Sequence, residues 1–467
     1  MQNSLLQGLN ANSRTTNGMR ANTTTFSRNV DLFFAAGASR GKDISGLFAK
    51  ACGEDLDIAV RILQWTRDIR GGAGERQVFN TIVKKLANGN KEELAVASKL
   101  LPKIPEIGRW KDVLELFGTP LEADAARFIG EALAERNGLA AKWMPRKGPI
   151  SVALRTYWDL SPRQYRKLLV TLTNVVEQKM CAKEWETIDF GKLPSLASAR
   201  YQKAFNKNAG EQYAVYKAGL EKGTATINAG AVFPYDVVKS VKMGDHVVAN
   251  AQWKALPDYV QGSDERLIVV ADVSGSMGVP AGGNPNVTCL DVCISLAMYI
   301  AERGKGPFKD AFITFSSRPE LQILKGSTLR DRVNELSRAH WEMSTNLTAV
   351  FDMLLNTAVR DRVSEDEMPT TIVILSDMQF NSCVRTNGTA MQSIDARYSA
   401  AGYKRPKVVF WNLNSREGTN PATVNDQDVA LVSGFSPAIM KSILNGKDFS
   451  PEGIMLDTVR VDRYNWQ

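Results

Sequence analysis

The apolar run Leu267–Ala271 is followed at once by oxygen-bearing side chains at alternate positions, Asp272, Ser274 and Ser276. Five successive apolar residues predict a strand that is buried on both faces, as in parallel sheets. Ligands bind outside the carboxyl ends of strands in open α/β sheets, and hard cations prefer oxygen ligands. The spacing therefore predicts a Mg²⁺ or Mn²⁺ site on the turn that follows this strand.

Two later segments offer further oxygen ligands for the same cation. Thr345 precedes a helical pattern at Leu347–Val363, and Asp377 follows a second apolar strand, Thr370–Leu375. Together with the Asp-x-Ser-x-Ser turn, these residues resemble the metal-ion-dependent adhesion site of von Willebrand factor A domains. The resemblance implies that the three hydroxyls bind the ion directly and that the two aspartates act partly through water. The alternative is that both serines only shape the turn and cap a helix.

Strands and helices alternate through the rest of this region. Further apolar strands are predicted at Asp310–Ser316 and Lys407–Leu413, and helices at Leu290–Arg303, Leu329–Ser337 and Ser436–Leu444. Such alternation is typical of a parallel, doubly wound sheet. We therefore predict an α/β, Rossmann-like von Willebrand A domain over residues 264–467.

Residues 28–263 are predicted to be helical almost throughout. Apolar residues recur on one helical face in several segments, for example at Ile58, Ile62, Trp65 and Ile69. Glycine, proline and asparagine separate these segments, and no alternating strand pattern occurs before Leu267. Successive helices with short loops predict an all-α bundle or HEAT-like solenoid. Residues 1–27 are polar, rich in Asn and Thr, and expected to form a flexible arm.

The positive charge of the chain lies entirely in its N-terminal half. The net charge is +8 over 467 residues, made up of +10 in residues 1–264 and −2 in residues 265–467. A basic half attracts nucleic acid, although charge alone accounts only for non-specific attraction. The alternative, equally consistent with charge alone, is a well-solvated helical surface.

Basic residues gather in loops between the predicted helices. Arg67, Arg70 and Arg76 surround a glycine-rich turn, where glycine would let the backbone approach a phosphate and arginine would bind it through two donors. The alternative is that the glycines cap helices while arginines pair with Asp68 and Glu75. The other residues predicted to contact RNA are Arg109, Lys111, Arg146, Lys147, Arg163, Arg166 and Lys167.

Other classes of site are disfavoured by composition. Five cysteines form no CxxC pair, and two histidines are too few for a histidine-rich metal centre. No GxSxG motif accompanies a possible serine-hydrolase triad, so we predict that the protein is not an enzyme. No apolar run reaches the roughly 18 residues that span a bilayer, and the N-terminus lacks a secretory apolar region. We therefore expect a soluble, cytoplasmic protein.

Four segments ahead of the predicted A domain resemble a branch related to the TROVE-domain proteins, the family of the Ro autoantigen. They are Ile104–Asp112, Trp143–Arg146, Lys179–Trp185 and Ile227–Pro234. In Ro-like proteins a ring of HEAT-like helices is closed by the A domain. The hole of that ring takes single-stranded RNA ends, and its outer surface binds small structured RNAs. The resemblance therefore implies the same architecture and a non-catalytic, RNA-binding ribonucleoprotein component here.

A second functional hypothesis remains open. A cation held by Asp272, Ser274, Ser276, Thr345 and Asp377 would complete its coordination with an aspartate or glutamate from a protein partner. The chain would then be a metal-dependent adhesion or scaffold module, and its helical half would only support the site. RNA in the purified protein would favour the first hypothesis, and a bound protein without nucleic acid would favour the second.

Overall fold

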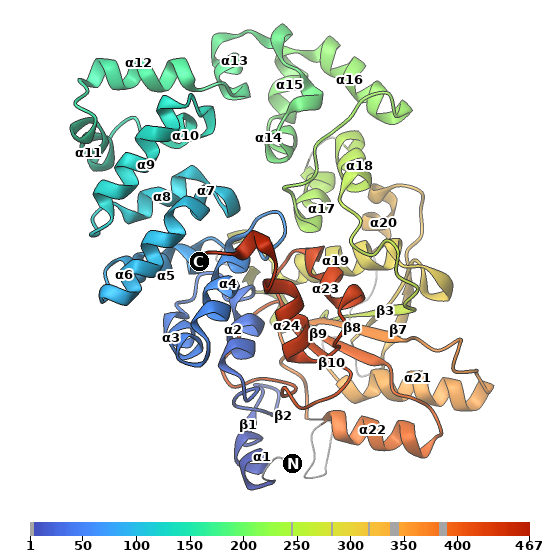
Figure 1. Ribbon diagram of the computed structural model, residues 1–467. Helices are drawn as coiled ribbons and strands as arrows, with labels where there is room; N and C mark the ends of the chain where they lie inside the picture. The colour runs from blue at the N-terminus through green and yellow to red at the C-terminus, as the bar shows by residue number, and fades with distance from the viewer. Residues whose placement is uncertain (1–3, 244–245, 282–283, 316–317, 337–344, 383–389) are drawn as a thin grey trace.

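The computed structural model describes residues 4–243, 246–281, 284–315, 318–336, 345–382 and 390–467. Apart from one short N-terminal hairpin, the described elements as far as residue 255 are helices, and a sheet flanked by helices follows (Figure 1). The helices of the first part are α1 (Ser4–Asn10), α2 (Arg28–Ala36), α3 (Ser45–Glu54), α4 (Leu56–Arg67), α5 (Gln77–Ala87), α6 (Lys91–Leu100), α7 (Ile104–Ile107), α8 (Trp110–Val113), α9 (Glu122–Ala134), α10 (Gly138–Trp143), α11 (Pro149–Tyr157), α12 (Pro162–Leu172), α13 (Val176–Ala182), α14 (Ser195–Arg200), α15 (Gln202–Asn208), α16 (Gly210–Lys222), α17 (Pro234–Met243) and α18 (His246–Ala255).

The predicted helical faces explain how these helices pack. Ile58, Ile62 and Trp65 are buried on α4, whose first turn is capped by the Asp55 side chain accepting from the Ile58 backbone N–H. Ile69, expected on the same face, lies beyond the end of α4 in the following loop.

The second part contains one six-stranded mixed sheet of strand order β10-β9-β8-β3-β6-β7. All neighbouring pairs are parallel except β6 and β7. Its strands are β3 (Leu267–Ala271), β6 (Ala311–Thr314), β7 (Glu320–Ile323), β8 (Thr371–Ser376), β9 (Lys407–Asn412) and β10 (Val429–Ser433), and its helices are α19 (Cys289–Arg303), α20 (Leu329–Leu336), α21 (Leu347–Asp361), α22 (Ala390–Ala400), α23 (Met440–Asn445) and α24 (Pro451–Val459). A separate hairpin, β4 (Pro280–Ala281) and β5 (Asn284–Thr288), leads into α19. The predicted alternation is confirmed, whereas β7 and β10 were not predicted.

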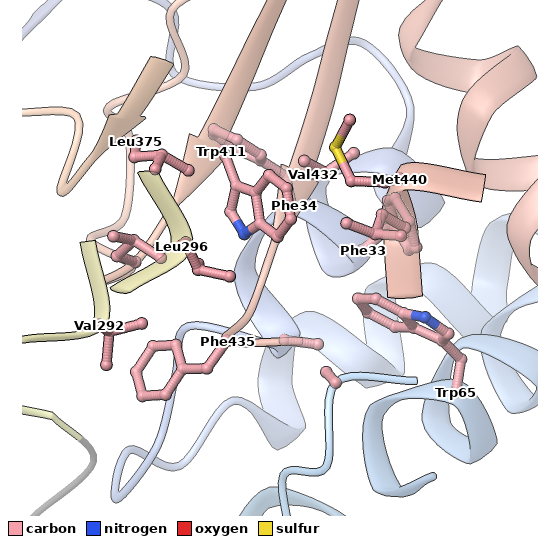
Figure 2. Packing of buried hydrophobic residues seen from close by; sticks show 14 of the residues in the cluster. Phe33, Phe34, Trp65, Val292, Leu296, Leu375, Trp411, Val432, Phe435 and Met440 are labelled. Atoms are coloured by element: carbon pink, nitrogen blue, oxygen red, sulfur yellow. The ribbon is translucent and has the colours of Figure 1, made fainter. Parts of the chain in front are cut away.

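The first helices share their core with the sheet. Phe33 and Phe34 of α2 pack among Trp65, Trp411 and Val432 (Figure 2). Backbone carbonyls of α2 also accept hydrogen bonds from the sheet: Ser433 Oγ donates to Phe33 O at 2.7 Å and Asn412 Nδ2 donates to Phe34 O at 3.2 Å. Helices α2 to α4 therefore form one unit with the sheet.

The remaining helices form an arc that leaves this unit after α4 and returns to it through α17 and α18 (Figure 1). On the return, α17 contacts α19, and both α17 and α18 contact α20. A second, smaller core around Phe190, Phe205 and Tyr213 joins α15, α16 and α18. Within the described ranges, no helix is long and apolar enough to cross a membrane.

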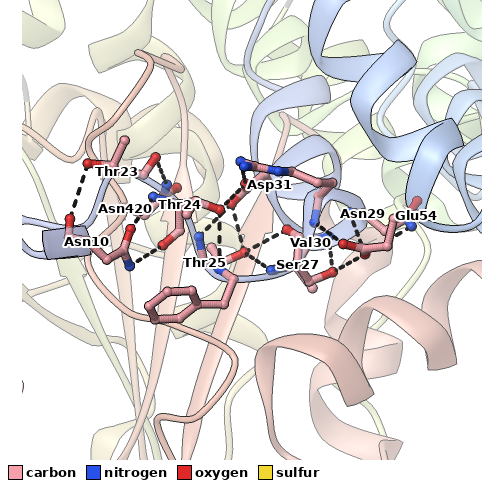
Figure 3. A network of polar contacts seen from close by, with 12 residues as sticks. Asn10, Thr23, Thr24, Thr25, Ser27, Asn29, Val30, Asp31, Glu54 and Asn420 are labelled. Carbon is pink, nitrogen blue, oxygen red and sulfur yellow. Dashed lines mark hydrogen bonds and ion pairs between the residues drawn. The ribbon is translucent and has the colours of Figure 1, made fainter. Parts of the chain in front are cut away.

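The N-terminal segment differs from the expected flexible arm, because it is folded onto the rest of the protein. After α1, residues Ser13–Arg14 (β1) and Arg20–Ala21 (β2) form a short antiparallel hairpin. Asp31 then accepts hydrogen bonds from the Thr25 backbone N–H and hydroxyl at 2.7 Å each (Figure 3). Asn22 pairs with Asn420 in an isolated antiparallel bridge. Side-chain hydrogen bonds, rather than apolar burial, hold much of this segment, so the hydrophobic pattern gave no sign of it.

Candidate cation site and basic surface

The acidic residues of the predicted cation site lie at the carboxyl ends of two adjacent strands. Asp272 follows β3 and Asp377 follows β8, and both side chains are fully buried. Asp272 Oδ2 accepts a hydrogen bond from Ser376 Oγ at 2.5 Å, and Asp272 Oδ1 accepts one from the Ser274 backbone N–H at 3.0 Å. The Ser274 and Ser276 hydroxyl oxygens lie 3.0 Å apart on the turn after β3. Because β3 and β8 are parallel neighbours, these oxygens lie together at the carboxyl-terminal end of the strands.

The electrostatics of the two carboxylates fit a cation. Burial raises the pKa of Asp272 to about 6, and the nearby Asp377 carboxylate also raises it. Burial likewise raises the pKa of Asp377. Asp377 Oδ2 is buried without a hydrogen-bond partner among the described residues, and Arg416 Nη2 lies 4.0 Å from it. A buried carboxylate oxygen without a donor is costly, and a hard cation would satisfy it.

The structure also places Thr345 beside this edge. Its buried hydroxyl donates to Gln379 O or Asn381 Oδ1, each at 3.1 Å, and Gln379 N donates to Asp377 Oδ1 at 3.1 Å. The five predicted ligands thus lie on three loops that meet at the sheet edge. No group of three or more His, Cys, Asp or Glu side chains suited to a metal occurs in the described part of the chain. The five predicted ligands offer a cation carboxylate oxygens from two aspartates and hydroxyl oxygens from two serines and a threonine.

The position of Arg67 contradicts its predicted role as an RNA contact. Its side chain is 1% exposed, and Arg67 Nε and Nη2 donate to Asp112 Oδ2 at 2.9 and 2.5 Å. Asp112 Oδ2 also accepts from the Arg109 backbone N–H at 3.1 Å. Arg67 therefore joins the end of α4 to the start of α8 and is not available to a phosphate.

The glycines of the turn after Arg67 are required by close packing. A Cβ on Gly72 would lie 1.9 Å from the Trp65 carbonyl oxygen. Gly74 has a φ of +70°, and a Cβ there would meet the Phe233 ring at 2.6 Å. The turn's acidic residues pair with arginines outside it: Asp68 Oδ1 accepts from Arg463 Nη2 at 2.9 Å, and Glu75 Oε2 lies 3.2 Å from Arg40 Nε. The partners expected for these acids were the arginines of the turn itself.

Arg109 lies near the charges of arginines from separate segments of the chain. Arg109 is half-buried, and its guanidinium lies 5.5 Å from the centre of the Trp143 ring. Burial lowers the pKa of Arg109, and so do the nearby charges of Arg67, Arg76 and Arg200, against the opposing effect of Asp112. Arg200 ends α14, which lies across the arc from α7 (Figure 1). Sequence reasoning missed Arg200, because nothing local relates it to Arg109.

A polar groove of about 560 Å³ continues this basic surface between α5 and the α8 region. Its lining includes four cations, Arg76, Lys84, Lys85 and Lys111, and two acids, Asp112 and Glu115. Lys85 pairs with Asp43 at 2.6 Å. None of the other three has an acidic partner within ion-pair distance in the described part of the chain. Lys84 and Lys85 were not predicted to contact RNA, although their place on the last turn of α5 is visible in the sequence.

Of the other predicted RNA contacts, one is held by local hydrogen bonds and the rest are exposed to solvent. Arg146 is held locally, because its Nη1 donates to Met144 O at 2.6 Å and to Ala141 O at 2.9 Å. Arg70 is exposed on the glycine-rich turn. The remaining cations are exposed on or near α11 and α12, away from the groove: Lys147, Arg163, Arg166 and Lys167.

Comparison with known proteins gives matches along the whole chain. Residues 266–463 match a domain of unknown function, DUF7788, and residues 151–265 match another, DUF2828. The crystal structure of the Deinococcus radiodurans RO (RSR) protein aligns with 94% of this chain and 100% of that chain, at 13% identity and a TM-score of 0.49.

A full-length sequence relative gives the assignment. Uncharacterized protein L728 of Acanthamoeba polyphaga mimivirus is 31% identical over 501 residues, which cover 95% of this chain and 86% of that protein. The two domain matches fall on the sheet region and on the second half of the helical arc. The chain therefore belongs to the same protein family as L728.

Proposed function

We propose that this protein binds RNA, without catalysing a reaction, through the basic inner surface of its helical arc. The observation that carries the proposal is that Arg76, Lys84 and Lys111 line one polar groove and have no acidic partner among the described residues. Like charges are held together at a cost, and phosphates would relieve that repulsion. The motif resemblance to TROVE-domain proteins points to the same partner, as single-stranded ends or small structured RNA.

Arg109 lies near the charge of Arg76 and extends the proposed contact surface beyond the groove. Arg109 stacks over Trp143, which suits a surface that also accepts bases, since bases stack on aromatic rings and guanidinium groups. A polar, basic groove with a stacking platform beside it favours a single strand over a duplex.

Fluorescence anisotropy with labelled single-stranded RNA tests this proposal. The variant Arg76→Gln/Lys84→Gln/Lys111→Gln removes three charges from exposed side chains and is expected to fold normally. If each cation neutralises one phosphate, the affinity at 0.1 M salt falls by about 100-fold, because each contact contributes a salt exponent of about 0.7.

A matched control removes three exposed lysines from the sheet region, Lys305, Lys309 and Lys404. This control changes the net charge equally and is expected to bind RNA within about threefold of the wild type. Equal losses in both variants would show that net charge, and not the groove, attracts RNA. Wild-type protein that binds no RNA at low salt would refute the proposal.

We also propose that Asp272, Ser274, Ser276, Thr345 and Asp377 hold Mg²⁺ or Mn²⁺. The unpartnered Asp377 Oδ2 and the raised pKa of both aspartates support this site. The variant Asp272→Ala is expected to keep the fold and to lose the rise in thermal stability that Mg²⁺ gives the wild type. An unchanged Mg²⁺ response in this variant would exclude the site. A metal-dependent adhesion role would be favoured if Mg²⁺ were required to retain a protein partner.

A further inference from the structure

The turn of the N-terminal hairpin lies directly on the candidate cation site. Thr15 Oγ1 donates to Phe380 O at 2.6 Å, and Gly18 pairs with Asn381 in an isolated bridge. The Ser382 backbone N–H donates to Asn17 O at 3.0 Å. Thr15 is 4% exposed, so the contact between these two segments is buried. More than 300 residues of chain separate the two segments that meet here.

Three polar connections tie this turn to the predicted ligands. The Thr16 backbone N–H donates to Gln379 Oε1 at 2.8 Å, and Gln379 N in turn donates to Asp377 Oδ1. Arg416 Nη1 donates to Thr16 Oγ1 at 2.9 Å, while Arg416 Nη2 faces Asp377 Oδ2 at 4.0 Å. Asn17 Nδ2 reaches the Thr345 hydroxyl at 3.4 Å and donates to Gln379 O at 2.6 Å.

The side chain of Asn17 is the element of the turn best suited to a cation. Its nitrogen is fixed by the Gln379 carbonyl, which leaves the amide oxygen as the free end of the group. Within the described residues no donor reaches that oxygen. Amide oxygens are ordinary ligands for hard cations. Asn17 Nδ2 lies 3.4 Å from the Thr345 hydroxyl, so this side chain is adjacent to one of the predicted ligands.

We propose that the cation site fastens the chain's own N-terminal arm, with Asn17 as its in-chain ligand. This inference rests on the proposed cation site and is independent of RNA binding. The site then acts as a latch: a bound cation draws the arm onto the sheet edge. An acidic side chain of a partner reaches the cation only by displacing residues 15–18.

Hydrogen–deuterium exchange of the full chain, with Mg²⁺ or with EDTA, tests the latch. In the wild type, Mg²⁺ is expected to slow exchange of residues 13–22 by about tenfold. Asn17→Ala and Asp272→Ala abolish this slowing. Asn12→Ala, an exposed asparagine of the same arm, leaves it unchanged.

Calorimetric titration with Mg²⁺ gives a second readout. Asn17→Ala is expected to weaken Mg²⁺ binding by about tenfold. The latch would be refuted, and the cation site left standing, if Asn17→Ala bound Mg²⁺ as tightly as the wild type and Mg²⁺ did not change arm exchange in the wild type. A wild type that binds no Mg²⁺ would refute both, and neither result bears on RNA binding.

Discussion

Replacement of Arg67 by methionine is expected to destabilise the protein strongly without acting on an RNA surface. The guanidinium and the Asp112 carboxylate are 1% and 2% exposed, and two charge-assisted hydrogen bonds join them. Methionine fills a similar volume but leaves Asp112, among the described residues, with the Arg109 backbone N–H alone. Removing one partner of a buried ion pair costs about 3–5 kcal/mol, mostly because the remaining charge is uncompensated.

Urea denaturation followed by tryptophan fluorescence measures this cost. With a slope of about 3 kcal/mol per molar urea, the midpoint of Arg67→Met falls by about 1 M or more. The double variant Arg67→Met/Asp112→Leu removes both charges and recovers most of the loss, apart from about 1 kcal/mol for the lost helix cap. A single variant that unfolds at the wild-type midpoint but binds RNA weakly would refute this reasoning and return Arg67 to the RNA surface.

Two further predictions concern the glycine-rich turn and its partners. Gly72→Ala is expected to lower the free energy of unfolding by more than about 2 kcal/mol, because its Cβ would overlap the Trp65 carbonyl. The control Gly46→Ala in α3, where a Cβ would meet no atom within 4 Å, is expected to be neutral or stabilising. Equal effects of the two substitutions on thermal or urea unfolding would contradict the packing described. Burial opposes ionisation of Asp68, but hydrogen bonds from Arg463, the Arg70 backbone and Tyr464 outweigh it and lower its pKa. The stabilisation is therefore present above the unfolded pKa of about 3.9 and is lost as pH falls through the lower folded value. The stability difference between wild type and Arg463→Met should accordingly shrink from pH 6 towards pH 2, and a difference constant with pH would contradict this.

The sequence predicted the sheet well where apolar runs were long and followed by polar turns. β3, β6, β8 and β9 are buried strands of that kind, and each lies within two residues of its predicted bounds. The strand β7 was missed because its residues, Glu320–Ile323, form a largely exposed edge without a buried face. The strand β10 was missed although Val429–Ser433 is fully buried, and its short apolar run was a usable signal.

The candidate sites were predictable only in their local parts. Asp272, Ser274 and Ser276 lie on one turn, so their spacing was informative. Arg67 could not be assigned from its loop, because its partner, Asp112, lies 45 residues away. The contact between Asn17 and Thr345 and the proximity of Arg200 to Arg109 could not be predicted either, because these residues are far apart in the sequence and meet only in the folded chain. Glycines at positions 72 and 74 looked suited to a phosphate, but close backbone packing requires them.

The salt dependence of single-stranded RNA binding tests the central claim most directly. The affinity of the wild type is measured at several salt concentrations and compared with that of Arg76→Gln/Lys84→Gln/Lys111→Gln. A basic surface that neutralises several phosphates predicts a log–log slope of about −2 or steeper, and the variant slope should be shallower by about 2 units. A slope near zero, or the same slope in both proteins, would contradict RNA binding at this surface.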